Sequence, residues 1–367
     1  MKLIHCADVH LDSKMGRHLD DKKAKMRRDE VLQTFLRMVE YGAEQSVRAI
    51  LIAGDLFDTA RVSVGTLKAV ERAMLMHPEM DFYLLRGNHS AAGFLEVLDS
   101  IPDNLKLFSS DWTKYQLDEA GRVFLYGAEL NSENSGTLFR TLLPDYDRCN
   151  LVMLHGQQQN YVSRNKAENI ALGELRNKGI DYLALGHVHE YHMEQLDARG
   201  TWCYSGCLEG RGFDECGEHG FVLIDIDEGS GQLRYEFVPF ATRTLHTVPV
   251  DVSDCMNSSE MTDVVRDALQ ETGIPSKDMI KVVLTGKLDV MAEVSADFIA
   301  GALSEDYYFL KVSDETGIAI CYESFYGDES LKGEYVRLIM GDDTLDEETK
   351  AALVRYGLLA LAGEEII

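Results

Sequence analysis

The chain has no long hydrophobic run and little positive charge. No stretch of its 367 residues approaches the roughly 18 apolar residues of a membrane-spanning helix, and the chain starts without the charged and apolar regions of a secretory signal. These absences predict a cytoplasmic protein without a membrane partner. With 36 Lys and Arg against 62 Asp and Glu, the net charge of −26 argues against a general nucleic-acid coat.

Disulfide and phosphate-loop signatures are also absent. The seven cysteines are odd in number and widely scattered, so they do not describe a disulfide framework and fit a reducing compartment. Cys203, Cys207, Cys216 and His219 have the composition of a zinc site, but their spacing matches no usual zinc pattern, and we interpret these cysteines as small loop residues. No Walker-type glycine-rich loop is present, so any ATP dependence would come from another chain.

What the chain does contain is a series of Asp, Asn and His clusters, each of which directly follows a short apolar run. Such runs predict strands, and ligands at neighbouring strand ends converge in an open α/β sheet. Oxygen and nitrogen ligands without a thiolate suit Mn(II), Mg(II) or Fe(II) better than structural zinc, and predict a two-metal hydrolase. The clusters are Asp8-Val-His10, Gly54-Asp55, Gly87-Asn88-His89, His155-Gly156 and Gly186-His187-Val-His189.

The two-metal hypothesis gives each of these side chains a role. A carboxylate on a strand shared by both ions is the natural bridge, and Asp55 is the best placed. His89 is adjacent to a ligand but points differently, so we predict that it protonates the leaving group or stabilises the transition state. One metal is assigned to Asp8, His10, Asp55 and His189, and the other to Asp55, Asn88, His155 and His187.

Acidic charge is concentrated away from these clusters. Residues 251–367 contain 25 Asp or Glu and 9 Lys or Arg, whereas residues 1–250 contain 37 and 27. Two divalent ions would add positive charge inside the site itself, so a phosphate substrate is not excluded.

Apolar periodicity predicts the architecture. To about residue 240, strand-like runs alternate with helical patterns, which predicts a four-layer α/β sandwich of helices around two sheets. Short strands at 191–196, 201–204, 221–227 and 233–239 are predicted to be antiparallel and to complete the second sheet. From residue 244 a small α/β cap follows, with a strand at 244–250, a helix at 260–271, a strand at 280–285, a helix at 295–303 and a strand at 307–312. A capping box at Thr344-Leu-Asp-Glu347 predicts a helix that ends at Gly363 and is apolar nearly all round, so we expect it to be buried in the chain or against a partner.

These motifs, in this order, resemble the calcineurin-like metallophosphoesterase superfamily. The resemblance covers the first 240 residues well and the remainder more loosely. At four segments it narrows to the SbcD/YhaO-type DNA repair exonuclease subunits. These segments are Ile4-His-Cys-Ala-Asp-Val-His-Leu-Asp-Ser13, Ala53-Gly-Asp-Leu-Phe-Asp58, Tyr204-Ser-Gly-Cys-Leu-Glu-Gly-Arg211 and Gly217-Glu-His-Gly220.

The resemblance implies a metallophosphoesterase (nuclease) domain at residues 1–243, an α/β capping domain at 244–325 and a helical, partner-docking tail at 326–367. It implies Mn(II)-dependent cleavage of DNA by a two-metal hydroxide mechanism, and partnership with an SbcC-like coiled-coil ATPase; a homodimer is left open. The family usually has Asp after Gly-Asn-His, where this chain has Ser90. If that acid orients the histidine, His89 lacks the usual support.

Two other function classes share parts of this pattern. A phosphodiesterase or phosphatase that acts on nucleotides or other small phosphoesters is the alternative, because the metal core is common to both. A scaffold that has lost activity is disfavoured by the intact ligands at every motif.

Several further residues have a predicted surrounding role. Arg211 is predicted either to contact substrate phosphate or to be an ordinary loop arginine, Asp12 and Asp58 to lie behind the ligands or in turns, and His5 to lie in the core. A basic stretch could contact a DNA backbone, or could be a solvated loop and first helical turn. It comprises Lys14, Arg17, Lys22, Lys23, Lys25, Arg27 and Arg28.

Overall fold

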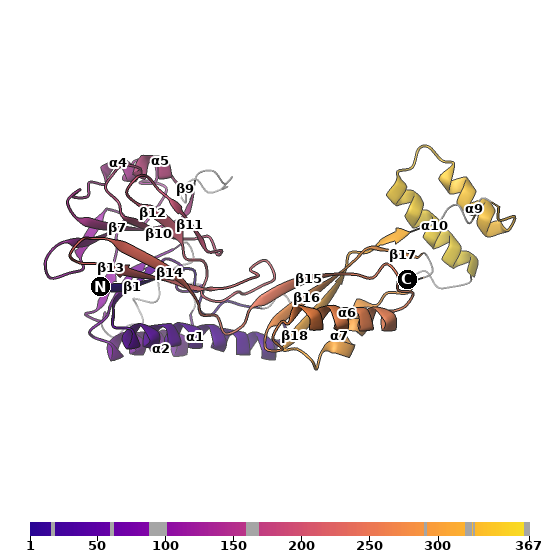
Figure 1. Ribbon diagram of the computed structural model, residues 1–367, viewed down its shortest axis with the longest axis horizontal. Coiled ribbons are helices and arrows are strands. Elements are labelled where there is room, and N and C mark those ends of the chain that lie inside the picture. Colours follow the sequence, from indigo (N-terminus) through magenta and orange to yellow (C-terminus); the bar gives the residue numbers. More distant parts are fainter. Residues whose placement is uncertain are drawn as a thin grey trace. The chain divides into compact units, whose positions relative to one another are not determined.

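The described chain forms two compact units, Met1–Thr244 and Leu245–Ile367 (Figure 1). None of the described helices is long and apolar enough to cross a membrane. The computed structural model describes residues 1–15, 19–58, 62–87, 101–158, 169–289, 292–319, 325 and 327–362.

The first unit contains two six-stranded sheets. In the first sheet, with strand order β14-β13-β1-β2-β3-β4, strands β1 to β4 run parallel and β13 runs antiparallel to both of its neighbours. Its strands are β1 (Lys2–Cys6), β2 (Val47–Ala53), β3 (Asp81–Leu85), β4 (Leu105–Leu107), β13 (Gly220–Ile226) and β14 (Leu233–Pro239).

The second sheet has the order β11-β12-β10-β7-β6-β5. Its four inner strands are parallel, and an antiparallel strand closes each edge. The strands are β5 (Thr113–Gln116), β6 (Val123–Gly127), β7 (Cys149–His155), β10 (Tyr182–Gly186), β11 (His192–Gln195) and β12 (Thr201–Tyr204), beside a small ladder of β8 (Gln157–Gln158) and β9 (Asn169–Ile170).

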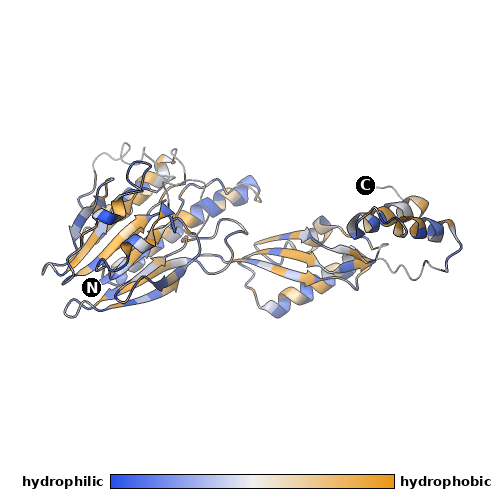
Figure 2. Cartoon of the chain, turned by 90° about the horizontal axis from the view of Figure 1, so that it is seen from above, coloured by the Kyte–Doolittle hydropathy of each residue, from blue (hydrophilic) through white to orange (hydrophobic). Residues whose placement is uncertain are grey.

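Apolar layers hold helices and sheets together, and the predicted four-layer fold is confirmed. Phe35 of the first helix and Ile50 lie in the core on the outer face of the first sheet. Leu51 and Met153 share the core between the two sheets, and Leu175 belongs to the outer core of the second sheet. Figure 2 shows the strands of this unit to be rich in apolar residues. The helices are α1 (Asp21–Glu44), α2 (Val64–Met76), α4 (Leu138–Thr141) and α5 (Leu172–Leu175).

The placement of the late strands differs from the sequence prediction. Only β11 and β12 join the second sheet, and β12 runs parallel to β10. Strands β13 and β14 extend the first sheet instead, where Ile224 pairs with Leu3. Because β13 is buried on both faces at most positions, it suits an inner place beside β1. The alternation of short strands therefore predicted their existence but not their sheet.

The second unit is a small α/β layer with its own core. A parallel sheet of three strands in the order β15-β16-β18 packs against two helices, through a core that includes Val265, Ile280 and Ile299. These elements match the predicted order of the cap. They are β15 (Leu245–Asp251), α6 (Ser258–Thr272), β16 (Met279–Thr285), α7 (Ala296–Leu303) and β18 (Phe309–Asp314), followed by the paired short strands β17 (Lys287–Asp289) and β19 (Gly317–Ala319).

The tail forms a pair of helices, α9 (Leu331–Met340) and α10 (Glu347–Ala362). Val336 of α9 and Val354 and Leu358 of α10 form a small shared core. The predicted capping box is wrong in one residue, because Asp346, not Thr344, caps α10 by accepting from the backbone N–H of Thr349 at 2.8 Å. Thr344 donates to Asp342 instead.

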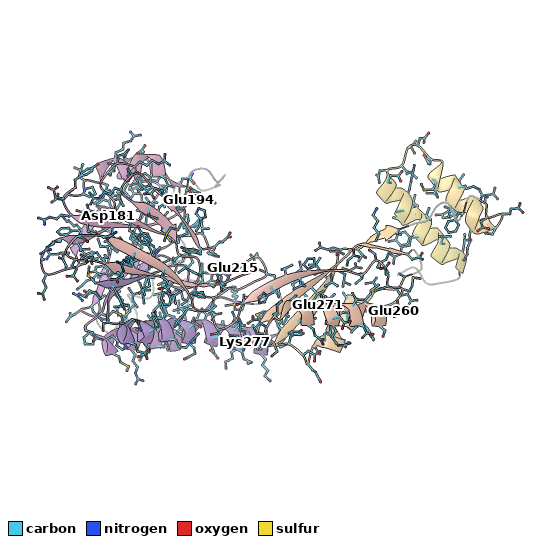
Figure 3. All side chains as sticks on the ribbon, in the orientation of Figure 1. Asp181, Glu194, Glu215, Glu260, Glu271 and Lys277 are labelled. Carbon is cyan, nitrogen blue, oxygen red and sulfur yellow. The ribbon has the colours of Figure 1, made fainter. Side chains whose placement is uncertain are left out.

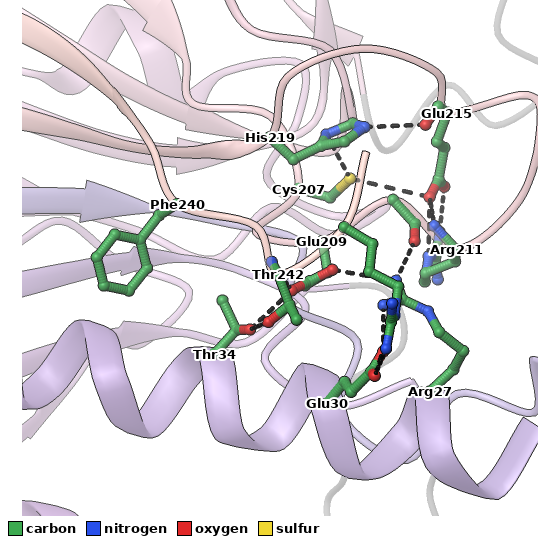
Figure 4. A network of polar contacts seen from close by, with 12 residues as sticks. Arg27, Glu30, Thr34, Cys207, Glu209, Arg211, Glu215, His219, Phe240 and Thr242 are labelled. Atoms are coloured by element: carbon green, nitrogen blue, oxygen red, sulfur yellow. Dashed lines mark hydrogen bonds and ion pairs between the residues drawn. The ribbon is translucent and has the colours of Figure 1, made fainter. Parts of the chain in front are cut away.

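A buried ion pair ties α1 to the segment after β12 (Figure 4). Arg27, only 1% exposed, donates to Glu209 at 3.0 Å and to Glu30 at 2.6 Å. Glu209 also accepts from Thr34 at 2.7 Å and from the backbone N–H of Thr242 at 2.5 Å. Arg27 is therefore part of the core, and neither alternative predicted for the basic stretch, a DNA contact or a solvated helical turn, holds for this residue.

Replacing Glu209 with Ala should destabilise the chain strongly. The substitution leaves Arg27 buried with one carboxylate partner fewer, and removing one partner of a buried pair costs about 3 kcal/mol or more. Urea denaturation of Glu209→Ala and of wild type measures the free energy of unfolding. A loss below about 1 kcal/mol, the range of exposed pairs, would contradict this account.

Candidate metal centre

The candidate site lies where four parallel strands end, two from each sheet. Asp8 follows β1 and Asp55 follows β2, while His155 is the last residue of β7 and His187 directly follows β10. Backbone bonds hold the first two loops together, because Asp8 N–H donates to Gly54 at 3.2 Å. Parallel neighbours end at the same edge, so these clusters meet although they are far apart in sequence.

The backbone at the site is strained. Asp8, His10 and Asp55 have φ values of 50°, 49° and 46°, and His187 has a φ of 102°. Non-glycine residues in these regions cost roughly 1 to 3 kcal/mol each and persist only where the surrounding structure enforces them. Asp8 and His10, on either side of the core residue Val9, both reach the site from this backbone conformation.

One group of ligand atoms forms around two imidazoles. His10 Nε2 lies 3.2 Å from His189 Nε2, and the rings meet edge to face with centroids 5.0 Å apart. Asp8 Oδ1 lies 3.9 Å from His189 Nε2, and Asp55 Oδ2 lies 4.0 Å from His10 Nε2. Asp8, His10 and His189 together could hold a metal ion.

A second group shares Asp8 and adds Asp55 and His155. His155 Nδ1 lies 2.9 Å from the carbonyl oxygen of Ala53, which fixes the proton on Nδ1 because a carbonyl only accepts. In the neutral ring Nε2 then carries the lone pair. This atom has no hydrogen-bond partner among the described residues and lies 3.4 Å from Asp55 Oδ2. The ring of His187 meets that of His155 edge to face at 5.4 Å, and its backbone N–H donates to Asp8 at 2.8 Å.

This donor set fits divalent cations. When His155 is neutral, its lone pair and the carboxylate of Asp55 face each other, and such an approach of two acceptors is stabilised by a cation between them, either a proton or a metal ion. Asp8, His10, Asp55 and His155 are all at most 5% exposed. Buried charges are found where they are paired or coordinate metals.

The electrostatics of the site favour positive charge. Burial raises the pKa of Asp8 above its usual value, although the nearby histidines oppose this. Burial lowers the pKa of His155, but the carboxylates of Asp55 and Asp8 outweigh it and raise the pKa to about 9. Burial also opposes the rise of the His189 pKa that Glu215 and Asp8 cause. The two carboxylates thus create a negative potential to which either protons or metal ions respond.

Two glycines leave room for the ligands. A Cβ on Gly54, whose φ is 102°, would lie 2.0 Å from His155 Nδ1. A Cβ on Gly87 would lie 2.1 Å from Asp55 Oδ1. Both distances are far below van der Waals contact, so side chains here would displace the ligand atoms.

The predicted site residues divide by what the structure describes. Asp8, His10, Asp55, His155, His187 and His189 are brought together. Asn88, His89 and Arg17 lie outside the described residues, so their predicted roles stay predictions. Lys22 is exposed and Lys23 partly exposed in the first turn of α1.

The surrounding residues take clear positions. Asp12 accepts from Ser63 N–H at 2.6 Å and from Thr66 at 3.0 Å, so it supports the start of α2. Asp58 Oδ1 lies 3.0 Å from His10 Nδ1, behind that ring. His5 is fully buried beside Tyr182, as predicted, and burial lowers its pKa to about 3.

Sequence reasoning missed Glu215. Its Oε1 lies 2.6 Å from His189 Nδ1. The only signal was its position four residues after Arg211, between the two resembling segments 204–211 and 217–220. Arg211 itself contacts Asp58 and Glu215, at 3.2 and 2.8 Å, and its predicted phosphate contact stays a prediction.

The cysteines form no zinc cluster among the described residues. Cys207 Sγ lies 3.2 Å from His219 Nδ1, whereas Cys203 donates to the carbonyl of Tyr204 at 3.4 Å. Cys216 is exposed.

The two sheets and the paired ligand groups define a metallophosphoesterase. Residues 1–191 match the sequence model described as calcineurin-like phosphoesterase, so the chain belongs to that family of hydrolases. Its fold implies divalent metal ions, and the candidate ligands are present.

Individual relatives are similar at low identity. The chain is 26% identical to the Bacillus subtilis protein named uncharacterized metallophosphoesterase YhaO, over 78% of this chain and 72% of that one. It is 27% identical to the DNA double-strand break repair protein Mre11 of Methanopyrus kandleri, over 86% of this chain and 73% of that one. A solved dimetal phosphatase from Danio rerio covers 61% of this chain and 92% of its own, at 13% identity and a TM-score of 0.38, too distant to inform function.

Replacing Asp55 with Asn should abolish metal binding at ordinary Mn(II) concentrations. Asn tolerates the positive φ of this position, so the change removes the charge with little backbone cost. Because residues behind a ligand already contribute 10- to 100-fold in affinity, loss of a shared ligand should cost about 100-fold or more. Calorimetric titration of Asp55→Asn with Mn(II) measures this. The control is Asp12→Asn, because Asp12 also has a positive φ but accepts hydrogen bonds at the start of α2. Equal Mn(II) affinities in the two variants would refute the assignment.

Proposed function

We propose that this chain is a metal-dependent DNA exo/endonuclease subunit that hydrolyses phosphodiester bonds in DNA repair. The observation that carries the proposal is the pair of overlapping ligand groups at the ends of parallel strands from two sheets. The groups share Asp8, and Asp55 Oδ2 lies between them, 4.0 Å from His10 Nε2 and 3.4 Å from His155 Nε2, which suits Asp55 as a bridging ligand. Two adjacent cation sites are the arrangement that phosphodiester hydrolysis uses.

The proposed ligands are Asp8, His10, Asp55 and His189 for one ion and Asp55, Asn88, His155 and His187 for the other, with Mn(II) as the preferred metal. Bound divalent ions would neutralise phosphate oxygens and make a nucleophilic water available at neutral pH. The protein holds the ligands in fixed orientations through strained loops. It excludes water by burying both carboxylates. His89 is proposed to donate a proton to the departing alkoxide, which two-metal chemistry does not supply.

DNA is the proposed substrate for two reasons. A relative of 27% identity is named a DNA double-strand break repair protein. The exposed cation Lys22 and the partly exposed Lys23 lie at the start of α1, shortly after the loop that carries Asp8 and His10. Cations at this position are suited to phosphates of a nucleic-acid backbone on either side of the cleaved bond.

DNA cleavage and small-diester hydrolysis should respond differently to charge reversal at α1. Purified protein with Mn(II) is expected to cut labelled duplex DNA and to hydrolyse a bis-aryl phosphodiester. Lys22→Glu with Lys23→Glu should weaken DNA binding. The slope of log K against log salt concentration should become shallower by about 2, one unit for each lost phosphate contact. Hydrolysis of the small diester should not change.

The control variant is Arg122→Glu with Arg234→Glu. Both residues are exposed. Arg234 of β14 pairs with Asp225 of β13, which pairs with Lys2 at the start of β1, so Arg234 lies at the end of the first sheet opposite to the site. Equal loss of DNA binding in both variants would contradict a contact at α1. Hydrolysis of the small diester without any DNA cleavage would overturn the nuclease assignment in favour of a small-molecule phosphodiesterase.

His89→Ala should separate proton donation from metal binding. A general acid contributes about 10² to 10⁴ in rate, so cleavage of DNA, whose leaving group is an alkoxide, should slow by about 100-fold or more. Mn(II) stoichiometry, measured by calorimetry, should stay at two. Loss of an ion in this variant would instead place His89 among the ligands.

An SbcC-like coiled-coil ATPase is the proposed partner, and the helix pair α9 and α10 is the proposed docking element. Leu331 and Leu338 of α9 are 68% and 71% exposed, and Tyr356 of α10 is 49% exposed. An amphipathic helix with apolar residues on its outer face can dock on a partner's helices.

Charge on this outer face should prevent docking. Leu331→Glu with Leu338→Glu leaves the shared core of α9 and α10 intact, so the variant should fold and hydrolyse the small diester as wild type does. A pull-down with the cognate ATPase should fail. Phe298→Glu, which alters a 55% exposed residue of α7, is the control. If the α9 variant still bound the ATPase with wild-type affinity, this face of α9 would be excluded as the docking surface.

A further inference from the structure

Three charged side chains connect the Nδ1 atoms of the His10 and His189 rings, the two rings whose Nε2 atoms face each other. His10 Nδ1 lies 3.0 Å from Asp58 Oδ1, and His189 Nδ1 lies 2.6 Å from Glu215 Oε1. Arg211 joins the two carboxylates, with Nη1 at 3.2 Å from Asp58 Oδ1 and Nη2 at 2.8 Å from Glu215 Oε1. We propose that Asp58, Arg211 and Glu215 form a clamp behind the two histidines, in which Glu215 is the positioning residue that sets the orientation and tautomer of His189 for metal binding.

The clamp acts through the single proton of a neutral imidazole. A carboxylate only accepts hydrogen bonds, so a neutral ring that faces one must carry its proton on Nδ1. The lone pair of His189 then resides on Nε2, which lies 3.2 Å from His10 Nε2 inside the site. Metal-ligating histidines commonly donate their other N–H to a carboxylate in this way.

A competing contact exists at His189. Arg211 Nη2 lies 3.0 Å from His189 Nδ1, and a guanidinium can only donate. That donation would force the ring proton onto Nε2 and remove the lone pair from the site. The contact with Glu215 is shorter, at 2.6 Å, and joins a donor to a charged acceptor. Arg211 already donates to Glu215, so we assign the Nδ1 proton to the Glu215 contact.

Glu215 is held firmly enough to orient a ring. Its Oε2 accepts from the backbone N–H of Arg211 at 2.7 Å, and its carbonyl oxygen lies 2.9 Å from His219 Nε2. Because that Nε2 donates, His219 Nδ1 accepts from Cys207, 3.2 Å away (Figure 4). The backbone and side chain of Glu215 are thus fixed from opposite sides, and its side chain is only 9% exposed.

The proposal deepens the proposed function, because it rests on the assignment of His10 and His189 as ligands. Its test therefore measures metal binding in the absence of any substrate. Glu215→Gln in the full chain keeps the size of the side chain and removes the charge. Calorimetric Mn(II) titration should show an affinity 10- to 100-fold below wild type, the usual effect of losing a ligand's carboxylate partner.

Asp181→Asn is the matched control. Asp181 forms a similar pair with Arg199, at 2.8 Å, but precedes β10, at the opposite end of that strand from His187. Figure 3 labels both Asp181 and Glu215. Asp181→Asn should lower the free energy of unfolding without changing the affinity for Mn(II). Arg211→Lys, which keeps the charge but loses the two-pronged geometry, should weaken Mn(II) binding less than Glu215→Gln does.

Histidine tautomers supply a readout that a purely structural role would not change. Long-range ¹⁵N–¹H spectra of the metal-free protein at alkaline pH, where the rings are neutral, should show His189 with its proton on Nδ1. In Glu215→Gln the proton should shift toward Nε2. A proton on Nε2 in wild type, or Mn(II) affinity in Glu215→Gln within twofold of wild type, would overturn the clamp.

Failure of the clamp and failure of the proposed function have different signatures. Unchanged Mn(II) affinity in Glu215→Gln, together with normal DNA cleavage, rejects the clamp and retains the nuclease. Weakened affinity in Glu215→Gln, with no DNA cleavage by wild type, supports the clamp and rejects DNA as the substrate.

Discussion

Burial of two carboxylates beside one another, Asp8 and Asp55, is the constraint on which the site depends. Taking a charged group out of water costs several kcal/mol unless other groups compensate. Part of the compensation is visible in the backbone N–H of His187, which donates to Asp8, and in the rings of His10 and His155 near Asp55. Divalent cations would complete it, because they would bring the opposite charge to carboxylates that are buried.

The surrounding fold is organised to keep these groups in place. Parallel strands from two sheets bring their ends to one edge, and left-handed loops turn the side chains inward. Farther out, Asp58, Arg211 and Glu215 hold the rings from behind. The buried pair of Arg27 and Glu209 anchors the same segment that carries Arg211. Stability and chemistry are thus supported by neighbouring parts of one loop.

Much of this could be predicted from sequence because the signals are local. An apolar run followed at once by Asp or His identifies both a strand and the end at which its ligand lies, so the sequence alone was enough to group Asp8, Asp55 and His155 in one site. Phe35 and Met38, three residues apart in α1, are both fully buried, as apolar residues at helical spacing predict. The strand and helix order of the second unit followed from the same periodicity.

Nonlocal pairings could not be predicted in this way. Nothing in the sequence around β13 shows that it pairs with β1 rather than completing the second sheet. Glu215 reaches His189 across 26 residues, and Arg27 reaches Glu209 across 182. Charge patterning alone made Arg27 look like a surface cation. Only packing reveals which ionic side chains are buried partners.

Anomalous scattering from crystals grown with Mn(II), recorded at the manganese absorption edge, tests the central claim most directly. The account predicts two peaks, one bound by His10 Nε2 and His189 Nε2 and the other by His155 Nε2, with Asp55 in contact with both. A single peak, or peaks that Asp8 and Asp55 do not contact, would contradict it.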